Sequence, residues 1–381
     1  MSGEPPLAGV VVVALEQAVA APLATRHLAD LGARVIKVER PGGDFARGYD
    51  SAVGGLSSHF VWLNHGKQSI ELDITSSRGR EVLDALVARA DVVVQNLAPA
   101  TARKHGLDAA TLVARHPRLV ACDVSGYGTG GPYSDRKAYD LLIQCEAGLV
   151  SITGSPDTPA KAGISVADIA AGMYAFSGVL SALFQRERTG AGQAVEVAML
   201  DALGEWMGFP YFYARYGGTA PRRSGASHAT IAPYGPVTTG TGEVVNVGLQ
   251  NEREWVAFCR IVLGMPEVAS DERFAGNAAR VRNRPELDAI VAGVLGGLAA
   301  EEVERRLTEA GIAYARQRTM AEFTEHPQLA ARGRWRPVDT PAGQVEALLS
   351  PLIGEWDGTT TRLPDVGEHT AEVLAWLGMD D

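Results

Sequence analysis

Alternating strands and helices in the first half of the chain predict an α/β protein with a Rossmann-like, doubly wound parallel sheet. Val10–Leu15 is an unbroken apolar run, which is typical of a strand buried on both faces. A helix expected over Ala20–Leu31 and a strand expected over Arg34–Glu39 complete a βαβ unit of about 30 residues. Because such a crossover joins parallel strands, the sheet is predicted to be parallel.

The alternation continues as far as residue 125, so this part of the chain is expected to form a doubly wound layer. The further elements predicted here are a short strand over Ser69–Leu72, a helix over Ser77–Arg89, a buried strand over Asp91–Asn96, helices starting at Thr101–Lys104 and covering Ala109–His116, and a strand over Leu119–Ser125. The turn after the first strand, Glu16–Pro22, lacks the glycine fingerprint of a dinucleotide site. The sequence also has no GxxxxGK(S/T) phosphate loop. The hypothesis of a Rossmann-type oxidoreductase is therefore weakly supported.

A long apolar helix is predicted over Gly163–Gly192. Apolar residues fill nearly every position of Ile169–Phe184, and the alanines and glycines among them favour close packing on several sides. The helix is expected to end at Arg186–Gly190, where basic residues precede a glycine. Asp168 is the unusual residue, because it puts a carboxylate where this apolar helix begins.

Asp168 has two interpretations. Ser165 and Asp168 have the spacing of a capping box, in which the serine caps the helix and the acid returns the hydrogen bond. Alternatively, the helix dipole and the free amide groups keep Asp168 ionised, so that it acts as a nucleophile on an activated acyl group. The helix pattern by itself is compatible with both.

The local composition of the sequence and the predicted elements divide the chain into four parts. A large α/β domain is expected over 1–190, a linker over 191–240, a small α/β domain over 241–311, and a C-terminal segment over 312–381 that returns to the large domain. The linker prediction rests on the Gly, Pro, Tyr, Arg and Ser content of that stretch. The tail is expected to return because the long helix leads away from the sheet.

Composition narrows the class of protein. The 381 residues carry a net charge of −10 with an isoelectric point near 5.4, which argues against a nucleic-acid-binding protein. Cys122, Cys145 and Cys259 have no metal-ligand spacing, so no metal is expected, and they suit reduced thiols in a cytoplasmic protein. The N-terminus has no signal-peptide pattern, and the long apolar helix is better explained as core than as a membrane span.

Several motifs follow one another in a fixed order. They are Leu28–Glu39, Asn64–Asp73, Ala90–Asn96, Ser125–Gly128, Lys137–Asp140, Asp168, Arg188–Gln193, His326–Leu329 and Gly367–Thr370. This series resembles the class III (family III) CoA-transferases of the CaiB/BaiF type, which include formyl-CoA transferase, carnitine CoA-transferase and α-methylacyl-CoA racemase. The resemblance covers nearly the whole chain, and it implies coenzyme A as co-substrate and an interlocked homodimer.

The resemblance also implies roles for individual residues. Asp168 matches the aspartate that serves as nucleophile. The positions that match CoA-contacting residues are Val19, Ala20, Arg40, Leu72 to Thr75, Asn96, Leu97, Ala98, Lys104, Lys137, Tyr139 and Asp140. Together with Arg47 and Lys67, three of these residues, Arg40, Lys104 and Lys137, are cations in loops after strands, where an α/β fold binds ligands. Gln17 and His228 are second-tier candidates for substrate contact.

The activity implied by the resemblance is transfer of CoA between an acyl-CoA and a free carboxylic acid. It proceeds through an aspartyl mixed anhydride and an aspartyl-CoA thioester, without ATP or a metal, and amides near Gln17–Ala20 suit the oxyanion. An alternative is an acyl-CoA isomerase, either racemase-like or moving CoA between two carboxylates of one molecule. Tyr139 stands where the racemase branch has histidine, and a phenol is a poor proton shuttle at neutral pH. A third hypothesis is a non-catalytic CoA-binding protein, and the presence of Asp168 argues against it.

Overall fold

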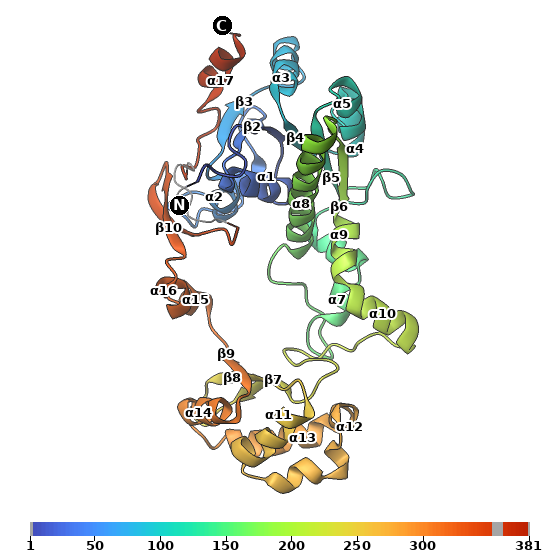
Figure 1. Ribbon diagram of the computed structural model, residues 1–381, viewed down its shortest axis with the longest axis vertical. Helices are drawn as coiled ribbons and strands as arrows, with labels where there is room; N and C mark the ends of the chain where they lie inside the picture. The colour runs from blue at the N-terminus through green and yellow to red at the C-terminus, as the bar shows by residue number, and fades with distance from the viewer. Residues whose placement is uncertain (1–2, 353–360, 380–381) are drawn as a thin grey trace. The chain divides into compact units, whose positions relative to one another are not determined.

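The computed structural model describes residues 3–352 and 361–379, and the chain forms two compact units (Figure 1). The first unit contains the described parts of Met1–Ala147, Ala162–Gly208 and Gln328–Asp381. The second unit contains Gly148–Lys161 and Phe209–Pro327. The end of the chain from Gln328 onward therefore groups with the N-terminal strands.

A six-stranded parallel sheet with the order β3-β2-β1-β4-β5-β6 organises the first unit. Its strands are β1 (Val11–Leu15), β2 (Arg34–Glu39), β3 (Gln68–Glu71), β4 (Val92–Gln95), β5 (Val120–Ser125) and β6 (Ala194–Ala198). The strand order reverses between β1 and β4, so the sheet is doubly wound, as the sequence predicts. This reversal is a topological switch point, the place where open α/β sheets bind their ligands.

Helices cover both faces of this sheet. The helices of the first unit are α1 (Ala20–Asp30), α2 (Ser58–Asn64), α3 (Ser77–Arg89), α4 (Pro99–His105), α5 (Ala109–Arg115), α6 (Asp140–Glu146), α8 (Val166–Thr189), α9 (Met199–Trp206) and α17 (Thr370–Leu377), with a 3-10 helix, η1, at Phe45–Gly48. On one face, Leu86 of α3, Leu112 of α5 and Val373 of α17 share a core cluster with Val13 of β1. Val12, the preceding residue, is also fully buried, and it points to the other face, where α1 and α8 pack together.

Helix α8 is the apolar helix that the sequence predicts. It ends at Gly190, which takes the left-handed conformation with φ of 74°. A Cβ on Gly172 would lie 2.7 Å from the carbonyl oxygen of Ala20, so this glycine allows α8 to approach the start of α1. Among the described residues, only α8 is long and apolar enough to cross a membrane, and half of its apolar stretch is buried within the protein. Its contacts with α1, β5 and β6 account for its apolar sequence.

The stretch 191–240, predicted to be a linker, contains regular structure, so that prediction is wrong for its first part. It includes β6, which pairs with β5 at the edge of the sheet, and α9. Helix α10 (Gly208–Gly217) follows. A five-residue strand such as β6 is stabilised by pairing with a partner that is distant in sequence, which local composition does not reveal.

The second unit combines a three-stranded antiparallel sheet with short helices. Its strands are β7 (Tyr234–Thr238), β8 (Val244–Gly248) and β9 (Ala313–Arg316). Its helices include α7 (Leu149–Ile152), α11 (Glu252–Ala257), η2 (Phe258–Leu263), η3 (Pro266–Ser270), η4 (Glu272–Phe274), α12 (Asn277–Arg282), α13 (Arg284–Leu295), α14 (Ala300–Ala310) and α15 (Met320–Thr324). Helix α16 (Pro327–Ala331) lies at the boundary of the units, and the hairpin of β10 (Trp335–Thr340) and β11 (Gly343–Leu348) belongs to the first unit.

Two histidines are buried in a polar cluster where α1 meets the C-terminal segment. Arg336 of that segment donates a hydrogen bond to Asp30 of α1 at 3.1 Å. Burial, followed by the charge of Arg26, lowers the pKa of His27 to about 3. Burial and the nearby arginines likewise lower the pKa of His65 to about 3. The folded protein therefore keeps both rings neutral.

Acidification is predicted to destabilise the first unit through these histidines. The unfolded chain protonates them near pH 6.5, so their contribution is fully present above that pH and is lost as the pH falls toward 3. At pH 5 the loss is up to about 2 kcal/mol per histidine. Denaturant unfolding at pH 7.5 and pH 5 measures the difference. His65→Gln should reduce it and the half-exposed His116→Gln should not; an equal pH dependence in both variants would contradict the prediction.

Candidate active site

The turn that follows β1 has a strained backbone held by side chains from elsewhere in the sequence. Ala18 has φ of 62°, and it is the only non-glycine residue with positive φ among the described residues. Asn96, just after β4, accepts a hydrogen bond from Gln17 N at 3.0 Å and donates one to Gln17 O at 2.9 Å. Asp44 Oδ1 accepts from Ala18 N at 3.4 Å. Strain of this kind is maintained only where the surroundings fix it, and it concentrates at functional sites.

A buried ion network lies beneath this turn. Lys67 Nζ is 2.6 Å from Glu16 Oε1, and Lys37 Nζ lies 2.9 Å from Asp44 Oδ2 and 3.5 Å from Glu16 Oε1. Burial by itself would raise the pKa of Glu16, but the Lys67 and Lys37 ammonium groups outweigh it and lower that pKa. The side chains of both lysines are fully buried. The expectation that Lys67 is a loop cation available to CoA phosphates is therefore wrong, because its charge is used inside the protein.

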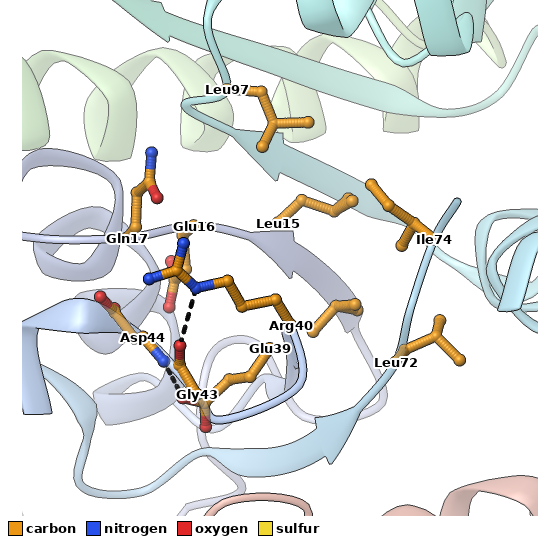
Figure 2. Close-up of a pocket in the computed structure, with 11 residues that line it drawn as sticks. Leu15, Glu16, Gln17, Glu39, Arg40, Gly43, Asp44, Leu72, Ile74 and Leu97 are labelled. Atoms are coloured by element: carbon orange, nitrogen blue, oxygen red, sulfur yellow. Dashed lines mark hydrogen bonds between the residues drawn. The ribbon is translucent and has the colours of Figure 1, made fainter. Parts of the chain in front are cut away.

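A pocket of about 110 Å³ opens at the carboxyl ends of β1, β2 and β4 (Figure 2). Its lining residues are Leu15, Glu16, Gln17, Val38, Glu39, Arg40, Gly43, Asp44, Leu72, Ile74 and Leu97. Figure 2 shows the polar residues Gln17 and Asp44 at one end, the apolar Leu72 and Ile74 at the other, and Leu97 between the two ends. The structure thus brings together five predicted site residues, Gln17, Arg40, Leu72, Ile74 and Leu97, at the switch point of the sheet.

A second, more open hollow lies beside this pocket. It is lined by Ile74, Thr75, Ser76, Ser77, Arg80, Lys104 and His105, and Ile74 borders both. Three predicted residues, Ile74, Thr75 and Lys104, line this hollow. Arg80 is a further component that the sequence analysis missed, because an arginine in the first turn of a helix looks like any solvated cation. The cations Arg80 and Lys104 therefore lie next to the apolar end of the first pocket.

The first turn of α8 is capped by Asp140, which the sequence analysis predicts as a CoA contact and not as a helix cap. Ser165 makes no side-chain capping hydrogen bond, so the capping-box interpretation of Ser165 and Asp168 is wrong. Asp140 Oδ1 instead accepts from Ala167 N at 2.8 Å and from Asp168 N at 3.4 Å. Gln144 Nε2 donates to the other Asp140 oxygen at 2.7 Å, which fixes the carboxylate in this orientation.

Asp168 is half-buried, and its environment favours the protonated form. Burial, followed by the negative charge of Asp140, raises the pKa of Asp168 to about 7. The expectation that the helix dipole keeps Asp168 ionised is therefore wrong. The amide groups that would provide that stabilisation already bind Asp140.

The start of α8 lies against the start of α1. Ile169, next to Asp168, packs on a small cluster that contains Val19 and Leu23. Burial, followed by the negative charges of Asp44 and Asp168, raises the pKa of the Tyr49 phenol. The first turn of α8, which carries Asp168, thus packs next to the residue that follows the strained Ala18. Tyr49 and Asp44 are site components that the sequence analysis missed, since neither has a distinctive local pattern.

The remaining predicted residues differ in accessibility. Val19 and Ala20 are buried at the start of α1, whereas Ala98, Lys137 and Tyr139 are exposed. His228 lies in the second unit, where its ring stacks on Tyr234 and its Nδ1 accepts from Thr230 N at 3.2 Å. The described residues contain no group of three or more His, Cys, Asp or Glu side chains arranged to hold a metal ion.

Known proteins resemble this chain along nearly its whole length. The profile of CoA-transferase family III matches residues 7–370. Succinate–glutarate CoA-transferase of Agrobacterium fabrum is 35% identical over 98% of this chain and 96% of its own length. Acetyl-CoA:oxalate CoA-transferase of Acetobacter aceti is 34% identical over 86% and 84%. The crystal structure of a CaiB/BaiF family protein from Brucella suis is 35% identical, with a TM-score of 0.84 over 98% of this chain and 100% of that one.

These likenesses define a transferase that acts on thioesters of coenzyme A. The chain belongs to CoA-transferase family III, and it is a CoA-transferase whose co-substrate is a CoA thioester. The CaiB/BaiF resemblance predicted from the ordered sequence motifs is confirmed.

The acid limb of the pH profile is predicted to depend on Asp140. The raised pKa of Asp168 makes its ionised form increase through pH 7, so kcat/KM should rise with pH in that range. Asp140→Asn removes the neighbouring charge and should move the limb down by roughly one pH unit, while burial keeps it above that of a free carboxyl. Asp135→Asn removes an exposed carboxylate and should leave the limb unchanged. An identical limb in all three proteins would contradict this assignment.

Proposed function

We propose that this enzyme transfers CoA between the thioester of a dicarboxylic acid and a free carboxylic acid, with Asp168 as covalent nucleophile. The observation that carries the proposal is the half-buried Asp168 carboxylate, of raised pKa, beside the strained turn at the switch point of the sheet. A more basic carboxylate is a stronger nucleophile, and a pKa of about 7 leaves a substantial ionised fraction at neutral pH.

The proposed reaction consists of two exchanges at Asp168. Its carboxylate oxygen attacks the thioester carbonyl carbon, the C–S bond breaks, and CoA thiolate leaves with the electron pair. The thiolate then attacks the Asp168 carbonyl of the mixed anhydride, which releases the donor acid and leaves an aspartyl-CoA thioester. An acceptor carboxylate repeats these steps in reverse, so no proton, ATP or oxidant is consumed.

Backbone amides near the turn are the proposed oxyanion donors. The amide of Gln17 is bound by Asn96 and that of Ala18 by Asp44. The amides of Gln17 and Ala18 are therefore not the proposed oxyanion donors. We assign this role to the first turn of α1, because the initial N–H groups of a helix lack intrahelical acceptors. Val19 and Ala20, which are predicted CoA contacts, lie in this turn.

The carboxyl edge of the sheet is the proposed CoA site. CoA has a phosphorylated nucleotide at one end and a less polar arm that ends in the thiol. The hollow with Arg80 and Lys104 suits the phosphates, and the apolar end of the neighbouring pocket suits the arm. Arg40 lies at the rim of this pocket, where its Nε donates to Gly43 O at 3.2 Å.

The choice of dicarboxylic acids rests on the named substrates of the relatives. The protein from Agrobacterium fabrum acts, by name, on succinate and glutarate, and the protein from Acetobacter aceti acts on acetyl-CoA and oxalate. Each of these names contains at least one dicarboxylic acid. At 34–35% identity, a related substrate class is the best-supported proposal for this chain.

Hydroxylamine trapping tests the nucleophile directly. The protein is incubated with succinyl-CoA, glutaryl-CoA or acetyl-CoA, with and without hydroxylamine, and its peptides are analysed by mass spectrometry. An activated Asp168 should be converted to a hydroxamate only when a productive acyl-CoA is present, and Asp168→Ala should show no such change. If Asp168 is never labelled but solvent deuterium enters the α-carbon of the bound acyl group, the enzyme is an isomerase and the proposal fails.

We further propose that two copies of the chain assemble, as the family resemblance implies for an interlocked homodimer. In the second unit, α10 has no buried residue, and its aromatic side chains are largely exposed. These are Phe209, Tyr211, Phe212 and Tyr216, with 53%, 55%, 61% and 73% exposure. A cluster of exposed aromatic rings is typical of an interface.

Light scattering with size exclusion tests this assembly. The wild type should have twice the chain mass of 40.2 kDa, and interlocked subunits should not separate on dilution. Phe212→Ser with Tyr216→Ser should lower the mass or broaden the peak, whereas Val256→Ser, at an exposed apolar residue on α11, should not. A wild type of single-chain mass would overturn the assembly proposal and leave the proposed chemistry to be judged by hydroxylamine trapping.

A further inference from the structure

Three consecutive residues after β1 are held by side chains from several other segments. The contacts are Thr25 and Lys67 on the Glu16 carboxylate, Lys37 on the Glu16 carbonyl, Asn96 on both polar backbone atoms of Gln17, and Asp44 on the amide of Ala18. Packing of the turn alone does not require so many polar contacts. Their common effect is to fix the backbone of residues 16–18 in one conformation.

Ala18 makes such fixation necessary. Its φ of 62° lies in the left-handed region, where the Cβ of an alanine crowds the backbone and a glycine does not. Without external contacts, the turn would relax toward an ordinary conformation and would carry Gln17 with it. Gln17 lines the pocket next to Asp44, so its side-chain position depends on the same backbone.

The amide of Asn96 is the contact that fits this task most closely. It accepts from Gln17 N at 3.0 Å and donates to Gln17 O at 2.9 Å, so both of its polar atoms are directed to one residue. We propose that Asn96 is a positioning residue, which holds Gln17 and Ala18 in the reactive geometry. This differs from the CoA contact that the resemblance implies for Asn96, and it rests on the proposed function because the turn it holds lies beside Asp168.

A double-mutant cycle between Asn96 and Ala18 tests this role. Asn96→Ala should lower kcat about tenfold or more while changing KM for succinyl-CoA little, because the turn is loosened and no ligand contact is lost. Ala18→Gly relieves the steric cost of positive φ, so in the Asn96→Ala background it should recover a large part of kcat. The expected coupling is about 2- to 160-fold, the range observed for residues coupled through a shared backbone shift. Ala18→Gly on its own is the second single variant of the cycle, and its kcat is needed to calculate the coupling.

Asn96→Asp is the conservative variant, since it keeps the acceptor for Gln17 N and loses the donor to Gln17 O. Its kcat should lie between those of the wild type and Asn96→Ala, and it keeps the test available if the alanine variant does not fold. Circular dichroism melts of each variant separate loss of the turn from loss of the fold.

Two results would overturn the inference. The first is a large rise in KM for succinyl-CoA with unchanged kcat and no recovery by Ala18→Gly, which would make Asn96 a CoA contact. The second is wild-type kinetics in Asn96→Ala. The cycle measures steady-state CoA transfer and needs no covalent label, whereas the proposed nucleophile fails only if wild-type Asp168 is not trapped. The two failures are therefore distinguishable.

Discussion

The buried ion pairs that Glu16 forms with Lys37 and Lys67 are the interaction on which the rest of the site depends. Moving a charge from water into a protein interior costs several kcal/mol, and removing one member of a buried pair leaves that cost uncompensated. Here Glu16 and Asp44 face Lys37 and Lys67, so the four charges balance within a few ångströms.

The network also joins three segments of the first unit. Glu16 directly follows β1, Lys37 lies in the neighbouring strand β2, and Lys67 follows α2. Each ion pair therefore fixes one wall of the pocket relative to another. The strained Ala18 follows Glu16 by two residues, and the next residue, Val19, belongs to the cluster on which Ile169 of α8 packs.

The N-terminus of α8 shows how neighbouring charges determine the reactivity of one group. A carboxylate in this position is ordinarily stabilised as an anion by the helix amides. Because Asp140 takes those amides, Asp168 has a like charge nearby and no compensating donor there. For a proposed nucleophile this arrangement is useful, since a carboxylate of higher pKa attacks a thioester more readily and is a poorer leaving group from the anhydride.

The sequence predicts the parallel sheet well because strands buried on both faces give continuous apolar runs. It fails where a feature depends on partners distant in the chain. Strand β6 is short and is stabilised by β5, more than sixty residues earlier, and Asp140 caps a helix that begins 26 residues later. Lys67 has the local pattern of a surface loop, and only the fold shows that it is buried against Glu16. Asp168 was found through the ordered motifs, but its raised pKa follows from three-dimensional contacts.

The turn after β1 explains why this Rossmann-like sheet needs no glycine-rich fingerprint. In dinucleotide enzymes that turn approaches a pyrophosphate, which requires a bare backbone and free amide groups. Here the amides of Gln17 and Ala18 are bound by Asn96 and Asp44, so the turn has no capacity to hold phosphate. The proposed CoA site therefore relies on side-chain cations for the phosphates, and Arg80 and Lys104 line the hollow that we propose for them. This separation leaves the switch point to the acyl group, where the proposed mechanism places the attack of Asp168.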